Sequence, residues 1–185
     1  ASRSPETAQL IDDAERAGLP TLGMTWQHSV ERAVREWSDR YDTVVISCGP
    51  FGYLGLARFF SEHWGARVIV DFRDPYAGDQ RMAYTDAQLD LLREHESASL
   101  QRASAVVSVN EHCLESISPN WRGPRLVVSN GYDERTLDAA RERVRVRSAN
   151  DLVQLVYVGT VYRAWSMADL LDALHAIGAA SSSSH

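Results

Sequence analysis

Short apolar segments that alternate with helical patterns constrain the fold of this chain most strongly. The first segment, Thr43–Cys48, is rich in β-branched residues and ends at a Gly-Pro pair, which is typical of a strand. Further strands are expected over the segments Arg67–Asp71, Ala105–Val109, Leu126–Val128 and Leu152–Val158. Because these segments are apolar through their length, we expect a parallel sheet that is buried on both faces.

Helical patterns separate the expected strands. Ser4-Pro5-Glu6 combines a capping serine, a proline at the first helical position and an acid in the first turn, so a helix is expected to run from there to Gly18. Other helices are expected over about Ser29–Asp39, Tyr53–Trp64, Asp86–Arg102, Glu111–Ile117, Arg135–Arg143 and, after a Ser166 cap, up to Ile177. The predicted class is α/β, a Rossmann-like parallel sheet with helices on both faces.

Charge and composition exclude several function classes. The net charge of −6 disfavours electrostatic binding to the phosphates of nucleic acid, so no nucleic-acid partner is expected. All 19 basic residues are arginine. The absence of lysine excludes P-loop enzymes, protein kinases and pyridoxal-phosphate enzymes, each of which needs a lysine amine.

Metal and cofactor motifs are also missing. Cys48 and Cys113 lie far apart with no CxxC motif, so neither a zinc site nor a disulfide framework is expected. Glu94-His95-Glu96 lacks the second histidine of an HExxH motif, and we expect this part of its helix to face solvent or an interface. We therefore predict no metal and no cofactor.

Polar residues directly follow the expected strands, and in parallel sheets ligands bind beyond these carboxyl ends. Gly49, Phe51 and Gly52 form one such loop, which either turns the chain or lets a ligand approach the backbone. Other candidate residues are Asp71, Arg73 and Asp74 after the second strand, Asn130, Gly131 and Asp133 after the fourth, and Gly159, Thr160 and Arg163 after the fifth. Taken singly, each group can equally be a turn or a local ion-pair network.

The order of these segments resembles glycosyltransferases of the GT-B fold, family 4 type. The matching segments are Asp71-Phe72-Arg73-Asp74-Pro75-Tyr76, the unit from Glu96 to Val109, Val128-Ser129-Asn130-Gly131-Tyr132-Asp133, and Val156-Tyr157-Val158-Gly159-Thr160. They span about Tyr41 to Ile177, and Ser104 stands where the family usually has an aspartate.

The resemblance implies the transfer of a sugar from a nucleotide-sugar donor to an acceptor hydroxyl, with retention and without a metal. It places Gly49, Phe51, Gly52, Asp71, Arg73 and Asp74 on the acceptor side. It places Gly159, Thr160 and Arg163 near the donor diphosphate, and gives Asn130, Gly131 and Asp133 a structural role at the crossing between domains. Catalytic residues remain unassigned.

The resemblance also implies a domain organisation. Residues 1–150 would be part of an N-terminal, acceptor-side domain, and residues 151–180 the first strand and helix of a donor-side domain. Residues 181–185 resemble a linker or tag remnant. The resemblance therefore implies an incomplete GT-B enzyme, which we expect to be inactive as an isolated chain.

Two other classes of function stay open. One is a non-catalytic α/β binding or interaction module, and the other is a small hydrolase using Asp71 or Asp74, which lacks a nucleophile and base arrangement. The transferase would be cytoplasmic, with peripheral contact to the inner membrane where its acceptor is lipid-linked. If the strand at Leu152–Val158 stays unpaired, its edge offers a surface for homo-oligomerisation.

Overall fold

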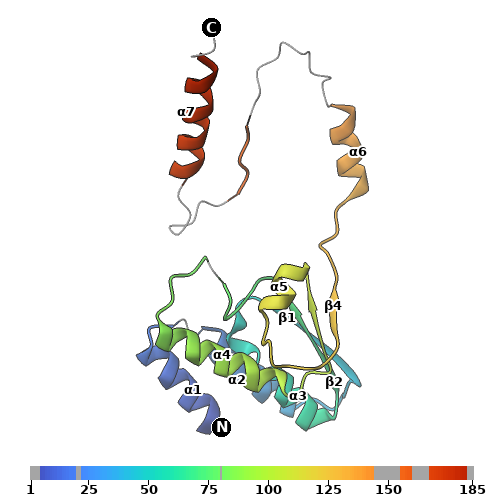
Figure 1. The fold of residues 1–185 in the computed structure, drawn as a ribbon. Coiled ribbons are helices and arrows are strands. Elements are labelled where there is room, and N and C mark those ends of the chain that lie inside the picture. Colours follow the sequence, from blue (N-terminus) through green and yellow to red (C-terminus); the bar gives the residue numbers. More distant parts are fainter. Residues whose placement is uncertain (1–4, 20–21, 80, 144–154, 160–166, 183–185) are drawn as a thin grey trace. The chain divides into compact units, whose positions relative to one another are not determined.

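The computed structural model describes residues 5–19, 22–79, 81–143, 155–159 and 167–182 (Figure 1). The chain divides into two compact units. The first, called the sheet unit here, contains residues 1–79 and 84–131, and the C-terminal unit contains residues 80–83 and 132–185.

The sheet unit is built on a four-stranded parallel sheet with the strand order β1-β2-β3-β4 (Figure 1). The strands are β1 (Thr43–Cys48), β2 (Arg67–Phe72), β3 (Ala105–Ser108) and β4 (Arg125–Val127). Ser47 pairs in register with Asp71 and Phe72 with Ser108, so the carboxyl ends of the strands lie at one edge. This confirms the predicted α/β class and parallel sheet.

Six helical segments accompany the sheet. They are α1 (Pro5–Arg16), α2 (Leu22–Arg35), the 3-10 turn η1 (Phe51–Tyr53), α3 (Leu56–Trp64), α4 (Asp86–Leu100) and α5 (Glu111–Ser116). Helix α2 begins seven residues before the expected Ser29. The cap of α4 is Thr85 rather than Asp86, because its side chain accepts from Gln88 N while Gln88 Oε1 accepts from Thr85 N.

Only one face of the sheet is covered within the sheet unit. Val68, Val70 and Phe72 point to the helical side and are 0% exposed, whereas Val45 on the other face is 62% exposed. Each strand lies beside the one before it, and right-handed crossovers that always step in the same direction place all their helices on one face. The expectation of helices on both faces is therefore wrong for the part of this unit that the structure describes.

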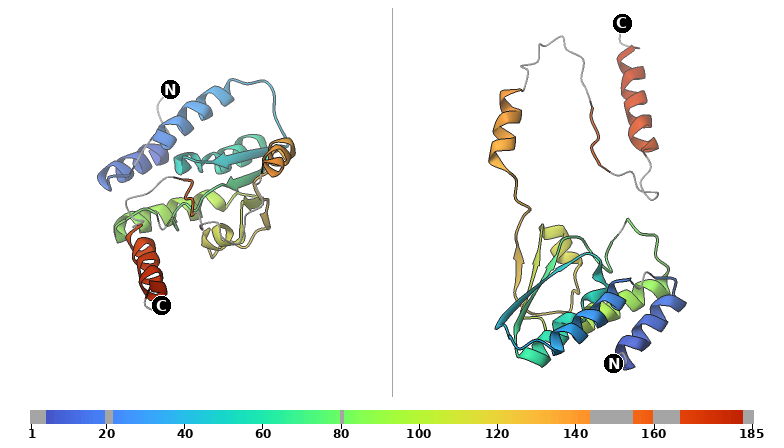
Figure 2. Two further views of the ribbon diagram at one scale, coloured as in Figure 1. Left: turned by 90° about the horizontal axis from the view of Figure 1, so that it is seen from above. Right: turned by 180° about the vertical axis from the view of Figure 1, so that it is seen from behind.

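The C-terminal unit contains α6 (Glu134–Glu142) and α7 (Ala168–Ser182) (Figure 2). The expected fifth strand is not seen at residues 155–158, where the chain has no regular secondary structure and Val158 is 90% exposed. A strand requires a hydrogen-bonded neighbour, and the four described strands pair only with one another. Residues 152–154 of the predicted strand and the predicted helix cap at Ser166 lie outside the described residues. None of the described helices is both long and apolar enough to cross a bilayer.

Arg125 at the start of β4 anchors the loop that follows α5. Its guanidinium donates to the carbonyl oxygens of Leu114, Ile117, Ser118 and Trp121 at 2.8–3.1 Å. Leu114 O and Ser118 O also accept from the backbone amides of Ile117 and Trp121, and the planar guanidinium of Arg125 binds all four carbonyls of this turn at once.

Substitution Arg125→Lys should therefore lower the free energy of unfolding by about 2–3 kcal/mol, because one ammonium group cannot serve all four carbonyls. Urea denaturation of the full chain measures this. The exposed neighbour Arg122 provides the control, and Arg122→Lys should change the free energy by less than about 0.5 kcal/mol. Equal effects of the two substitutions would show that the carbonyl contacts do not stabilise the loop.

The expectation that Glu94-His95-Glu96 faces solvent or an interface is wrong for two of the three residues, which are buried within the chain itself. His95 is 7% exposed and Glu96 is 2% exposed. Adjacent residues on a helix point in directions that differ by about 100°, and here both directions are filled, one by Tyr76 and one by the loop after α5. Glu96 accepts a 2.7 Å hydrogen bond from Ser118 N, and the Tyr76 hydroxyl lies 3.1 Å from His95 Nδ1.

Burial lowers the pKa of His95 from 6.5 to about 4, so protonation favours unfolding. The stability that comes from keeping this imidazole neutral is present above about pH 6.5 and is lost as the pH falls to about 4. We expect this loss to reach about 3 kcal/mol. Burial raises the pKa of Glu96, so the contribution of Glu96 to stability has the opposite pH dependence. The contribution of His95 is therefore obtained from the difference in free energy of unfolding between the unmodified protein and a His95 variant.

Chemical denaturation of the unmodified protein and of His95→Gln between pH 4 and 7.5 tests this expectation. The free-energy difference between the two proteins should shrink as the pH falls below about 6.5. A difference between His95→Gln and the unmodified protein that stays constant with pH would contradict a buried neutral imidazole.

Candidate functional site

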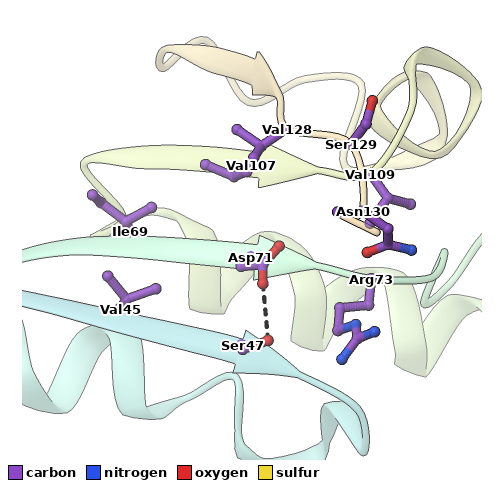
Figure 3. Close-up of a pocket in the computed structure, with 11 residues that line it drawn as sticks. Val45, Ser47, Ile69, Asp71, Arg73, Val107, Val109, Val128, Ser129 and Asn130 are labelled. Atoms are coloured by element: carbon purple, nitrogen blue, oxygen red, sulfur yellow. Dashed lines mark hydrogen bonds between the residues drawn. The ribbon is translucent and has the colours of Figure 1, made fainter. Parts of the chain in front are cut away.

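A cavity of about 520 Å³ lies against the helix-free face of the sheet (Figure 3). Its floor consists of valine and isoleucine side chains from β1, β2 and β3 and from the residue that follows β4: Val45, Ile69, Val107 and Val128. Alternation along a strand sends every second side chain to the same face, which is why residues so far apart in the sequence share one surface. The floor is apolar but open to solvent, since Val128 is 60% exposed.

Polar side chains occupy the end of this cavity at the carboxyl ends of the strands. Ser47 belongs to β1, Asp71 to β2, and Arg73 follows β2, while Ser129 and Asn130 follow β4. Figure 3 shows Arg73 and Asn130 at the same end of the cavity. The site therefore offers one carboxylate, one guanidinium, one amide and two hydroxyls around an apolar floor.

The register of the sheet holds Asp71 in place. Ser47 is directly opposite Asp71 on the neighbouring strand, and its hydroxyl donates a 2.8 Å hydrogen bond to Asp71 Oδ2 (Figure 3). This contact engages one carboxylate oxygen, and a carboxylate has further lone pairs that can accept from a ligand. Asp71 is thus oriented by the protein and still able to bind.

Four of the residues predicted from the sequence come together here. Asp71, Arg73, Asn130 and Gly131 all line the cavity, although almost 60 positions separate the first from the last. The idea that polar residues at successive strand ends gather at one edge is therefore confirmed for β2 and β4.

Gly49, Phe51 and Gly52 do not line the cavity but build the loop beside it. Gly49 has a φ of 145°, which favours glycine, and its amide donates to the Tyr53 hydroxyl at 3.2 Å. Phe51 stacks on Tyr76 with ring centroids 4.8 Å apart. A Cβ on Gly52 would lie 2.7 Å from Met24 N, so this glycine permits α2 and η1 to touch through their backbones.

The remaining predicted residues lie elsewhere. Asp74 is exposed and is not part of the cavity lining. Asp133 caps α6 by accepting from Arg135 N at 3.0 Å, which is a structural role. Gly159 is exposed in the C-terminal unit, and Thr160 and Arg163 lie outside the described residues.

The sequence prediction missed Ser47 and Ser129 and the apolar floor. A signal for Ser47 was present, since it occupies the same position relative to the end of β1 as Asp71 does relative to the end of β2. The floor could not be recognised because an apolar strand run does not reveal which of its faces a helix covers.

Nucleophilic chemistry has little support at this edge. Cys48 ends β1 close to the site, but burial, with Asp71 and Glu96 adding repulsion, raises the pKa of its thiol to about 12. The thiol therefore stays protonated and unreactive at neutral pH. Within the described ranges, no group of three or more His, Cys, Asp or Glu side chains is arranged to hold a metal ion.

Comparison with protein-family models, with curated proteins and with solved structures returned no match to this chain. The geometry of the strand-end cavity and the order of the sequence motifs are thus the basis for assigning a function.

Proposed function

We propose that the strand-end cavity is the acceptor side of a glycosyltransferase, which moves a sugar from a nucleotide-sugar donor to an acceptor hydroxyl. One observation carries this proposal. Asp71 and Arg73 of one motif and Asn130 of another, widely separated in the sequence, line the same cavity at the carboxyl ends of parallel strands. This is the place where folds of this kind bind their ligands.

The chemistry of the lining suits a polyhydroxylated acceptor. The Asp71 carboxylate can accept from a sugar hydroxyl, and the amide of Asn130 can both donate and accept. The apolar floor formed by Val45 and Val128 can contact the C–H face of a sugar ring. Arg73 adds a fixed positive charge that favours an anionic group on either substrate.

The donor side of the proposal rests on the sequence motifs. Gly159, Thr160 and Arg163 would face the donor diphosphate, whose negative charge must be neutralised when it leaves. The reaction would retain the configuration of the sugar and use no metal. The motifs assign no catalytic residue, so the acceptor site and the transfer step are tested separately.

A non-catalytic binding or interaction module is the second candidate. The observation that favours it is the helix-free sheet face, where Val45 and Val128 are 62% and 60% exposed. Apolar surface of this kind often marks a place where another protein binds. Such a module would ignore nucleotide sugars.

Titration of the full chain with a panel of mono- and disaccharides, followed by ligand-observed NMR, tests the acceptor site. At least one sugar should bind, and Asp71→Asn should weaken its binding roughly tenfold or more, because a hydrogen bond to a charged group is lost. Asparagine can still accept from Ser47, so the fold should be kept. Asp133→Asn, which preserves the cap of α6, should leave sugar binding unchanged.

The transferase step needs a second measurement. The protein encoded by the complete coding sequence should release nucleoside diphosphate from one nucleotide sugar in the presence of the acceptor. Sugar binding without any such release would favour the binding module. Equal effects of Asp71→Asn and Asp133→Asn on sugar binding would show that the strand-end cavity does not bind the sugar.

A further inference from the structure

A second cavity, of about 870 Å³, lies among the helices of the sheet unit. Its lining comes from α1, α2, Gly55, α3 and α4, so the sheet separates it from the strand-end cavity. No part of the proposed sugar-transfer chemistry uses it. For brevity it is called the helix cavity.

Three buried polar side chains, Gln27, His95 and Ser99, line the helix cavity, and the first two each have an atom without a hydrogen-bond partner in the described part of the chain. These atoms are Gln27 Oε1 and His95 Nε2, in residues that are 6% and 7% exposed. Buried polar atoms are nearly always paired, because leaving them unpaired costs free energy of folding. Two such atoms in the lining of one cavity indicate that something other than the protein pairs with them.

The surrounding contacts fix what each atom can do. Gln27 Nε2 donates to Glu31 Oε1 at 2.8 Å, which orients the amide and leaves Oε1 as an acceptor. The Tyr76 hydroxyl lies 3.1 Å from His95 Nδ1, and it is able to donate to this nitrogen because burial raises the pKa of Tyr76 and keeps the hydroxyl protonated. When Tyr76 donates to Nδ1, the proton of the neutral imidazole is on Nε2, which is then a donor.

Gly55 makes room for the Gln27 amide. A Cβ at position 55 would lie 2.7 Å from both Gln27 Nε2 and Gln27 Oε1. The φ of Gly55 is −59°, which any residue can adopt, so the backbone does not require glycine there. A larger residue at position 55 would therefore displace the Gln27 amide from its present place.

The rest of the lining selects the charge of an occupant. Leu10, Phe59 and Leu91 provide apolar surface. Four carboxylates line the cavity, but Asp13 pairs with Arg16, and Glu62 pairs with Arg102 at 3.8 Å, which leaves Glu31 and Glu94 beside the guanidinium groups of Arg35 and Arg58. The charges around the cavity therefore nearly balance, which suits an uncharged ligand.

We propose that the helix cavity binds a small uncharged organic molecule that donates a hydrogen bond to Gln27 Oε1 and accepts one from His95 Nε2. An alcohol or a primary amide on an apolar body has this chemistry. The site is independent of the strand-end cavity, so the proposal does not rest on the sugar-transfer function.

Benzyl alcohol and benzyl methyl ether form a matched pair of probes, because both can accept a hydrogen bond but only the alcohol can donate one. Each is titrated into the full isotope-labelled chain, and the side-chain NMR signals of Gln27 and His95 are followed. The alcohol should bind saturably, at the millimolar concentrations typical of so small a molecule, and should shift both signals. The ether should bind at least tenfold more weakly.

Gln27→Met, which keeps a similar shape without the amide, provides the protein variant. It should reduce alcohol binding to the level of the ether and, in the absence of any probe, raise the midpoint of thermal unfolding, because it removes an unpaired buried acceptor. Gln101→Met, at an exposed position after α4, should change neither. A merely structural glutamine would instead lose stability on substitution.

Three results would overturn the proposal. The first is equal binding of the alcohol and the ether, and the second is unchanged alcohol binding in Gln27→Met. The third is no alcohol binding together with water-to-imidazole cross-relaxation at His95, which would assign the two atoms to ordered water. None of these results bears on sugar binding at Asp71, so the two proposals fail separately.

Discussion

The handedness of the crossovers is the constraint on which the rest of the sheet unit depends. Strands β1 to β4 lie side by side in chain order, so each right-handed connection places its helix on the same face. Val68, Val70 and Phe72 are fully buried beneath those helices, and the opposite face, with Val45 at 62% exposure, is left open. The same asymmetry creates both cavities. One lies on the open face of the sheet, and the other lies within the helical layer.

Periodicity predicted much of the fold because its signals are local. The strand at Thr43–Cys48 and the helix that begins at Pro5 depend on nearby residues alone, and the structure places both as expected. Burial is different, because it depends on which segments meet. The run at β1 looked buried on both faces, and His95 and Glu96 looked solvated, since the sequence does not reveal on which side a crossover returns or which loop covers a helix.

The candidate site was predictable where it follows strand ends and not where it depends on register. Asp71, Arg73 and Asn130 were found because polar residues after parallel strands share one edge. Ser47 required the pairing of β1 with β2, and the helix cavity required the packing of four segments around Gln27. The sequence left open whether Gly52 belongs to a turn or to a ligand loop, and in the structure this glycine permits contact between two backbone segments.

The one-sided sheet is tested most directly by the reactivity of thiols placed on its two faces. Val45→Cys and Ile46→Cys, each made in a chain whose Cys48 and Cys113 are replaced by alanine, differ by one position and point to opposite faces. Under native conditions the thiol at position 45 should react with a water-soluble reagent at nearly the rate of an unfolded control, and the thiol at position 46 at least about a hundredfold more slowly. Strong protection at both positions would mean that the face we describe as open is covered, and would contradict the account.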